Sequence, residues 1–162
     1  MKKKWMIICC SVLLIGGLSL FLFNQKKQDT NDLMQLVIYP TGTADESYHF
    51  VLNKDGILKC SLGTRKNDNI ETRDFLKRIV DSSENLLTEH NVQMLIDFAN
   101  EFEASGYTEE KKIVKDSWNV AFLYNGKTYE MNWDINNSEL LEKLVEKFIE
   151  LSPIPVDLHG WA

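Results

Sequence analysis

The segment that most constrains the fold is SWNVAFLYNGKTYEMNW, residues 117–133. Asn125 and Gly126 form the pair that two-residue type I′ turns prefer, because both turn positions need a positive φ. This turn sets the register of two antiparallel strands and pairs Phe122 with Tyr129. One face of the hairpin then carries six large side chains, those of Trp118, Val120, Phe122, Tyr129, Met131 and Trp133. The other face is mostly polar, which predicts an antiparallel sheet covered on one side only.

Three further segments are typical of strands. Residues 33–40 (LMQLVIYP) end at a proline, and residues 47–53 (SYHFVLN) alternate apolar side chains between two faces. The sequence NKDG at 53–56 is a turn signal, so residues 57–62 are expected to return as the next strand of a hairpin.

Two segments have the periodicity of helices. In the first, Thr88 is a suitable N-cap, apolar residues recur at helical spacing, and Gly106 ends the segment. In the second, Asn136 is the expected N-cap of a helix that ends before Pro153. In residues Phe75–Val80 the spacing of Phe75, Leu76, Ile79 and Val80 gives a modest helix signal, but a strand is also possible and the sequence leaves the choice open.

These elements predict the fold class. We expect an α+β domain with an antiparallel sheet built from β-hairpins and helices packed on one face, preceded by a single N-terminal transmembrane helix. Roughly 130 residues are enough to bury one core without covalent links. Cys60 is the one cysteine after the N-terminal segment, so a disulfide within the domain and a four-cysteine zinc site are excluded.

The chain begins MKKKWMIICCSVLLIGGLSLFLFNQKK, and the run from Trp5 to Phe23 carries no formal charge. As a helix this run spans about 28 Å, close to the ~30 Å hydrocarbon thickness of a bilayer. A cleaved signal peptide is the alternative, with its cleavage site at residues 17–19, but the apolar letters LFLF continue past that site. Cys9 and Cys10 come too early in the run for lipoprotein processing. We therefore expect a retained anchor.

The charges beside the run predict its orientation. Three lysines precede it and two follow it, and the more positive flank favours the cytoplasm. The expected organisation is a cytoplasmic N-terminus (1–4), a transmembrane signal-anchor helix in contact with membrane lipid (5–23), a polar tether (24–32) and an extracytoplasmic domain (33–162). The protein would then be a single-pass protein of the cell membrane. Signal cleavage would instead give a secreted domain.

Net charge narrows the possible partners. Five of the 18 basic residues flank the apolar run, so residues 28–162 carry 13 basic and 24 acidic residues, a net charge of −11. A phosphate backbone would be repelled by such a domain, so we expect no nucleic-acid partner.

Catalytic, cofactor-binding and metal-binding residues are not indicated by any motif. His49, His90 and His159 lack metal-ligand spacing, and His49 is expected on the solvent side of its strand. Cys60 shares the alternating face of apolar neighbours, which predicts a buried, inert thiol. Two acidic clusters, NDNIETRD (67–74) and DINNSE (134–139), lack the spacing and glycine of a calcium loop. We therefore predict no catalytic residue, no metal site and no cofactor.

The tail after Pro153 is apolar and has two interpretations. Its side chains either pack over the core of the domain, or Leu158 and Trp161 contact a partner, since aromatic residues anchor interfaces. The leading functional hypothesis is a membrane-anchored extracytoplasmic protein with a non-catalytic interaction domain, whose partner is another envelope protein or a cell-surface component. The alternative is a tethered or secreted hydrolase that works through carboxylates.

Overall fold

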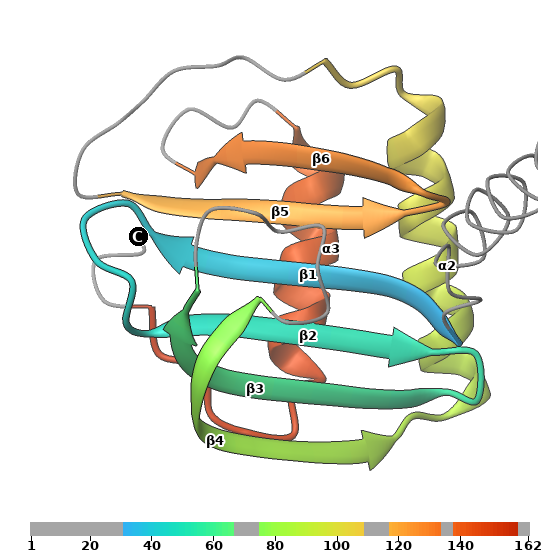
Figure 1. Ribbon diagram of the computed structural model, residues 1–162. Helices are drawn as coiled ribbons and strands as arrows, with labels where there is room; N and C mark the ends of the chain where they lie inside the picture. The colour runs from blue at the N-terminus through green and yellow to red at the C-terminus, as the bar shows by residue number, and fades with distance from the viewer. Residues whose placement is uncertain (1–30, 67–74, 109–116, 134–137, 159–162) are drawn as a thin grey trace, which may run out of the picture. The chain divides into compact units, whose positions relative to one another are not determined.

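The computed structural model describes residues 31–66, 75–108, 117–133 and 138–158. In these ranges the chain forms a six-stranded antiparallel sheet in the order β4-β3-β2-β1-β5-β6 (Figure 1). The strands are β1 (Asp32–Pro40), β2 (Ser47–Asn53), β3 (Ile57–Arg65), β4 (Leu76–Leu86), β5 (Trp118–Tyr124) and β6 (Lys127–Asn132). The helices are α2 (Glu89–Ala104) and α3 (Glu139–Glu150).

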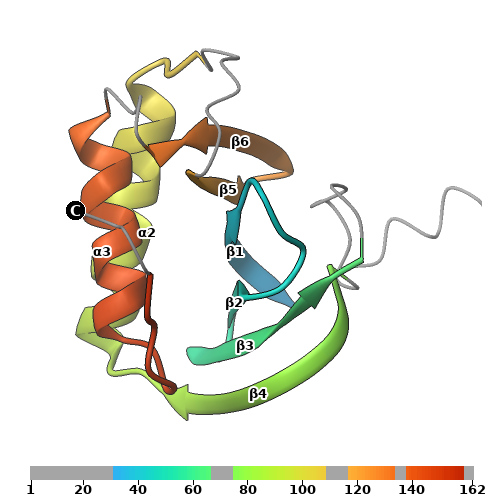
Figure 2. The ribbon, with the colours of Figure 1, turned by 90° about the vertical axis from the view of Figure 1, so that its left-hand side faces the viewer.

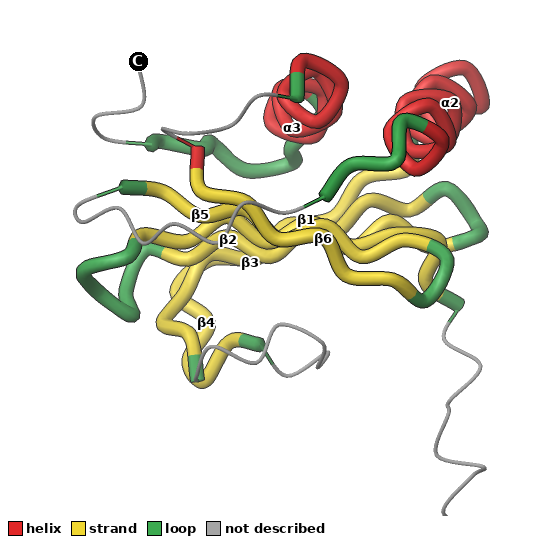
Figure 3. Tube along the Cα trace, turned by 90° about the horizontal axis from the view of Figure 1, so that it is seen from above, coloured by secondary structure: helices red, strands yellow, loops and turns green. Residues whose placement is uncertain are grey.

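Both helices lie on the same side of the sheet (Figures 2 and 3). The predicted α+β class, with an antiparallel sheet and helices on one face, is therefore confirmed for the described domain. The predicted transmembrane segment 5–23, its cytoplasmic flank 1–4 and most of the tether lie outside the described residues. Neither described helix has the length and apolar character needed to cross a bilayer.

The hairpin of β5 and β6 has the predicted turn and register. Asn125 and Gly126 have φ of 50° and 73°, as a type I′ turn requires. Phe122 pairs with Tyr129 across the strands. The Asn125–Gly126 turn determines this register. The apolar alternation agrees with it, because a one-residue slip would move every apolar side chain of the hairpin to the opposite face.

Strand β4 resolves the open choice at Phe75–Val80 in favour of a strand. It pairs with β3 along its length and forms one edge of the sheet. The ladder shifts register between Leu62 and Gly63, and Figure 2 shows β4 curving away from the side of the helices. A Cβ atom on Gly63 would collide with the backbone carbonyl oxygen of Arg78, so only glycine permits this close crossing.

The helix starts follow capping chemistry. Thr88 accepts a hydrogen bond from the backbone N–H of Asn91 at 3.3 Å, as predicted. The predicted cap of the last helix was wrong: Ser138 is the N-cap of α3, and its Oγ accepts from the N–H of Leu141 at 3.3 Å. Asn136 lies outside the described residues. Serine and asparagine are about equally good N-caps, so cap preference alone does not choose between Asn136 and Ser138 as the start of α3.

The main core lies between the sheet and the two helices. We define the helix-covered face of the sheet as the side that carries Phe50 of β2 and its alternate neighbours, and the open face as the opposite side. Large side chains that are fully buried in this core include Phe50, Phe102, Phe122, Phe148, Leu36, Leu52, Leu58, Leu95 and Leu141. Phe50 of β2 meets Phe148 of α3 edge-on at 5.8 Å between ring centroids. Aromatic and aliphatic burial of this kind is the main stabilising contribution to the fold.

The first residues of the tail pack on this core. Ile154 is buried, and Val156 and Leu158 are partly buried against the same cluster. The Tyr48 hydroxyl accepts a hydrogen bond from the backbone N–H of Asp157 at 3.1 Å, which ties the tail to β2. For these residues the packing interpretation of the tail is confirmed. Trp161 lies outside the described residues.

Candidate functional site

The open face of the sheet carries a second, smaller apolar cluster. Val37, Tyr39, Phe75 and Ala121 are buried in it, with Leu76 packed against them. We expected the polar-side residues of the β5–β6 hairpin to face solvent, and that expectation was wrong at Ala121, which is fully buried. The reason is tertiary: Phe75, at the start of β4, packs over the open face next to Tyr39, with ring centroids 5.9 Å apart.

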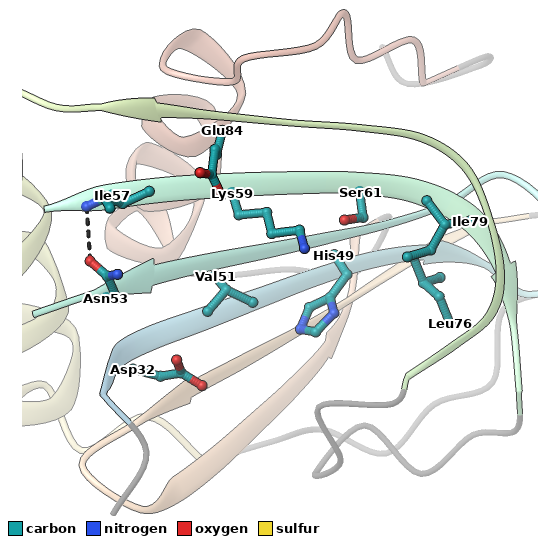
Figure 4. A pocket seen from close by; sticks show the side chains of 10 residues that line it. All are labelled: Asp32, His49, Val51, Asn53, Ile57, Lys59, Ser61, Leu76, Ile79 and Glu84. Atoms are coloured by element: carbon teal, nitrogen blue, oxygen red, sulfur yellow. Dashed lines mark hydrogen bonds between the residues drawn. The ribbon is translucent and has the colours of Figure 1, made fainter. Parts of the chain in front are cut away.

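Beside this cluster the open face contains a hollow of about 340 Å³, which we call the open-face hollow (Figure 4). It lies at the small end of the size range of ligand pockets. Strands β1 to β4 line it, with side chains from Asp32, His49, Val51, Asn53, Ile57, Lys59, Ser61, Leu76, Ile79 and Glu84. Four of these ten side chains are aliphatic, and six are polar or charged.

His49 of β2 is a buried polar side chain of this hollow, with 7% of its surface exposed. Its predicted position in solvent was therefore wrong. Its ring packs edge-on against Phe75 at 6.0 Å between centroids, so the start of β4 covers it. Burial lowers the pKa of His49 to about 4; nearby Asp32 opposes this shift and Lys59 adds to it. The imidazole is neutral at pH 7.

Two hydrogen bonds determine which nitrogen of His49 carries the hydrogen. The amide Nε2 of Gln35 donates to Oδ2 of Asp32 at 3.1 Å, and a carboxylate only accepts. The Gln35 amide oxygen is therefore the atom that lies 3.0 Å from Nε2 of His49. Because an amide oxygen only accepts, Nε2 of His49 must donate, which leaves Nδ1 as an unprotonated acceptor.

Nδ1 of His49 has no hydrogen-bond partner within the described part of the chain. In that same part, no buried side-chain nitrogen or oxygen lacks a partner, so Nδ1 is accessible to solvent rather than sealed in the core. Since His49 lines the open-face hollow, we infer that its lone pair is available there.

Lys59 of β3 brings a cation to the same place. Figure 4 shows its side chain extending along the hollow toward His49. Within the described ranges Lys59 makes no ion pair or hydrogen bond, although Glu84 of β4 lies opposite it in the ladder. The hollow therefore offers a hydrogen-bond donor from Lys59 and an acceptor from His49.

The carboxylates of the hollow do not form a catalytic pair. Figure 4 shows Asp32 and Glu84 well apart, with Val51 and Lys59 between them. Asp32 is already hydrogen-bonded to Gln35. General acid–base catalysis by two carboxyl groups needs both directed at one reacting bond, and these two groups are not.

The other predicted site residues lie elsewhere. Cys60 is fully buried on the helix-covered face, as predicted, and burial raises the pKa of its thiol to about 12, which makes it a poor nucleophile. His90 is exposed on α2, and His159 lies outside the described residues. The cluster 67–74 and most of 134–139 also lie outside them. Among the described residues no group of histidine, cysteine and acidic side chains has metal-site geometry.

Leu158, predicted as a partner contact, borders a second hollow of about 430 Å³ with Glu146, Ile149, Glu150 and Val156. This hollow lies between α3 and the tail. Because Leu158 is partly buried against the core, only part of its surface is free to meet a partner. Its contact with a partner stays a prediction, as does that of Trp161.

Exposed apolar side chains are concentrated on β4. In the part of the chain that the structure describes, the large hydrophobic side chains that are exposed are Ile79 (55%), Val80 (64%) and Leu86 (74%). Ile79 lines the open-face hollow, and Leu86 pairs with Ile57 of β3, another residue of its lining. The exposed aliphatic groups of β4 therefore border the hollow at two places, around Ile79 and around Leu86.

The sequence contained only a partial signal for this surface. His49, Val51 and Asn53 alternate along one strand, and Lys59 and Ser61 along the next, so each set shares a face. Nothing in the sequence showed that β4 would curve over both sets. Comparison of the chain with protein-family models and with curated proteins finds no match.

Proposed function

We propose that this protein is a single-pass, membrane-anchored protein whose extracytoplasmic domain is a non-catalytic interaction domain. The observation that carries the interaction part is the position of Ile79, Val80 and Leu86, exposed together on the edge strand β4 beside the open-face hollow. Ile79 and Val80 are adjacent exposed apolar residues of an edge strand, and both exposed apolar groups and edge strands favour contact with another chain. The anchor part rests on the uncharged run Trp5–Phe23.

The alternative, a carboxylate hydrolase, has less support. Asp32 and Glu84 are the acidic residues of the open-face hollow, and they are separated by Lys59 and Val51. A hydrolase would need two groups converging on one bond. The polar groups of this hollow are better suited to holding a bound group than to breaking one.

Site-specific photo-crosslinking in intact membranes tests the interaction surface. A photoreactive phenylalanine analogue at Leu86 of the full-length protein is expected to give a discrete adduct with one envelope protein. The matched control places the analogue at Lys143, an exposed position of α3 on the other side of the domain. Equal labelling from both positions, or no adduct from Leu86, would contradict the proposed surface.

Membrane topology is tested separately. An enzyme that is active only outside the cytoplasm, fused after Ala162, is expected to give signal in intact cells. Mass analysis of the mature N-terminus checks retention of the anchor. A chain that begins at Leu20 would replace the anchored protein with a secreted one.

A further inference from the structure

The open-face hollow has a combination of groups that selects among possible ligands. It has an unprotonated acceptor, Nδ1 of His49, and a cationic donor, Nζ of Lys59. Aliphatic side chains form the walls: Val51, Ile57, Leu76 and Ile79. A ligand that satisfies all of these needs an apolar body that ends in a group able both to donate and to accept a hydrogen bond.

Charged ligands fit this hollow poorly. An anion would be attracted by Lys59 but would meet the lone pair of His49 and the carboxylates of Asp32 and Glu84. A cation would be attracted by the carboxylates but repelled by Lys59. Burying either charge beside a group of the same sign costs more than burying a neutral polar group. An uncharged hydroxyl donates to His49 and accepts from Lys59 without either penalty.

The surface around the hollow indicates where the hydroxyl comes from. A small free molecule in the hollow would leave Val80 and Leu86 exposed on β4, at 64% and 74%. A polypeptide that inserts one side chain would cover them with the residues on either side of that side chain. A second copy of this chain is disfavoured, because each domain carries a net charge of −11.

We propose that the open-face hollow receives a tyrosine side chain from the partner protein. The tyrosine hydroxyl donates to Nδ1 of His49 and accepts from Nζ of Lys59, while the ring lies against Val51, which pairs with Lys59 across the β2–β3 ladder. Residues of the same peptide on either side of the tyrosine contact Val80 and, six residues further along β4, Leu86. Tyrosine is enriched in interface hot spots because it combines a large apolar ring with one polar end. Tryptophan would serve less well, since its N–H donates but does not accept from Lys59.

The state of His49 makes this recognition insensitive to mild acid. The pKa of His49 lies near 4, so Nδ1 remains an acceptor at pH 5.5 and at pH 8. Gln35 and Asp32 of β1 hold the ring in the required tautomer. Asp32 and Lys59 are the charged groups that act on the ring, and Glu84 of β4, the remaining charged residue of the lining, lies opposite Lys59. A surface histidine used for the same purpose would lose its acceptor below about pH 6.5.

This inference rests on the proposed function, because a tyrosine of a partner protein can enter the hollow only if the domain has such a partner. The first experiment tests the chemistry alone, with two probes that differ by one hydroxyl: N-acetyl-tyrosinamide and N-acetyl-phenylalaninamide. Each is titrated into the full-length protein in detergent micelles, and the imidazole nitrogen resonances of His49 are followed by NMR. We expect the tyrosine amide to move Nδ1 and to bind about tenfold more tightly than the phenylalanine amide.

Variants assign the two hydrogen bonds. Lys59→Met keeps the aliphatic stem and is expected to lower the preference for the tyrosine amide to about threefold, whereas the control Lys143→Met leaves it at tenfold. His49→Phe keeps a ring against Phe75 and is expected to lower the preference in the same way. If His49→Phe does not fold, Lys59→Met decides the question alone. Equal binding of both amides to the wild-type protein would overturn the inference.

The second experiment uses the partner segment that crosslinks to Leu86. We expect this segment to contain a tyrosine whose replacement by phenylalanine weakens binding about tenfold to the wild-type protein and about threefold to Lys59→Met. A captured segment without a tyrosine that contributes to binding would overturn the tyrosine inference and leave the interaction domain in place. Tight binding of the tyrosine amide with no adduct from Leu86 would overturn the proposal that the hydroxyl group belongs to a partner protein, and would favour a free small ligand. Loss of both results would contradict the proposed function itself.

Discussion

The two faces of the sheet are built from alternate residues of the same strands, yet they differ in kind. The helix-covered face is almost entirely apolar, and Phe50, Phe122 and Leu58 on it are fully buried. The open face combines a four-residue apolar cluster with His49, Lys59 and the carboxylates of the hollow. The first face stabilises the domain through burial, whereas the second places polar groups where a ligand can reach them. The main stabilising core and the proposed recognition surface therefore lie on opposite sides of one layer of backbone.

The sharpest test of this comparison uses two phenylalanines, one on each face. Phe148 packs on the helix-covered face and Phe75 on the open face, and both are fully buried. We expect Phe148→Ala to lower the unfolding free energy by about 3–5 kcal/mol, because the cavity is enclosed. Phe75→Ala should cost about 2–3 kcal/mol, because the cluster around Phe75 has only four buried members among the described residues. Urea unfolding of the full-length protein measures both, and equal costs would contradict the comparison.

Acid should weaken the open face through His49. The pKa of His49 is lowered from 6.5 to about 4 in the folded protein. Between these values the unfolded chain binds a proton that the folded chain does not, so stability is complete above pH 6.5 and falls as the pH drops toward 4. The loss at pH 4 should be about 3 kcal/mol relative to a variant without this histidine.

The measurement for His49 compares unfolding free energies at pH 7.5 and pH 4.5. His49→Phe should show a smaller fall than the wild-type protein, while the control His90→Phe, at an exposed position of α2, should show the same fall as the wild type. An identical fall in all three proteins would mean that His49 is not buried in its neutral form.

The curve of β4 over the open face depends on Gly63. Gly63→Ala places a methyl group against the carbonyl oxygen of Arg78, so β4 must move away from β3. We expect a loss of about 1–3 kcal/mol and faster hydrogen exchange confined to the amides of β4 and the end of β3. Thr64→Ala, at the next residue of the same strand, should leave this exchange unchanged. Exchange that rises equally in α2 would show that β4 is not a separable element.

The smallest expected effect concerns a helix that covers the first face. Thr88→Ala removes the side-chain acceptor for the N–H of Asn91 and should cost about 1 kcal/mol. Thr88→Ser retains the hydroxyl and should keep most of the stability. Chemical shifts of the open-face hollow should not change in either variant, and a shift there would link the two faces.

The sequence predicted the locally determined elements correctly and the environment of the open face incorrectly. Alternation and turn chemistry placed the β5–β6 hairpin, the β2–β3 hairpin and the start of α2, because each of these depends on residues close together in the chain. The buried state of Cys60 followed from its position between Leu58 and Leu62. The environment of His49 was predicted incorrectly, because its cover comes from Phe75, on a segment whose own structure the sequence left open.

By itself, therefore, the sequence determined the α+β class, the register of the β5–β6 hairpin and the identity of the apolar face, since these depend on local periodicity and on how many apolar residues share one side. Its uncharged N-terminal run also predicts an anchor, which remains a prediction. Only the tertiary structure decided that β4 is an edge strand and that it curves over the sheet at Gly63. That curve brings together His49, Lys59 and Ile79 from three strands. No local rule places them side by side, because side-chain neighbours across a sheet depend on strand order and bending, which the whole fold sets.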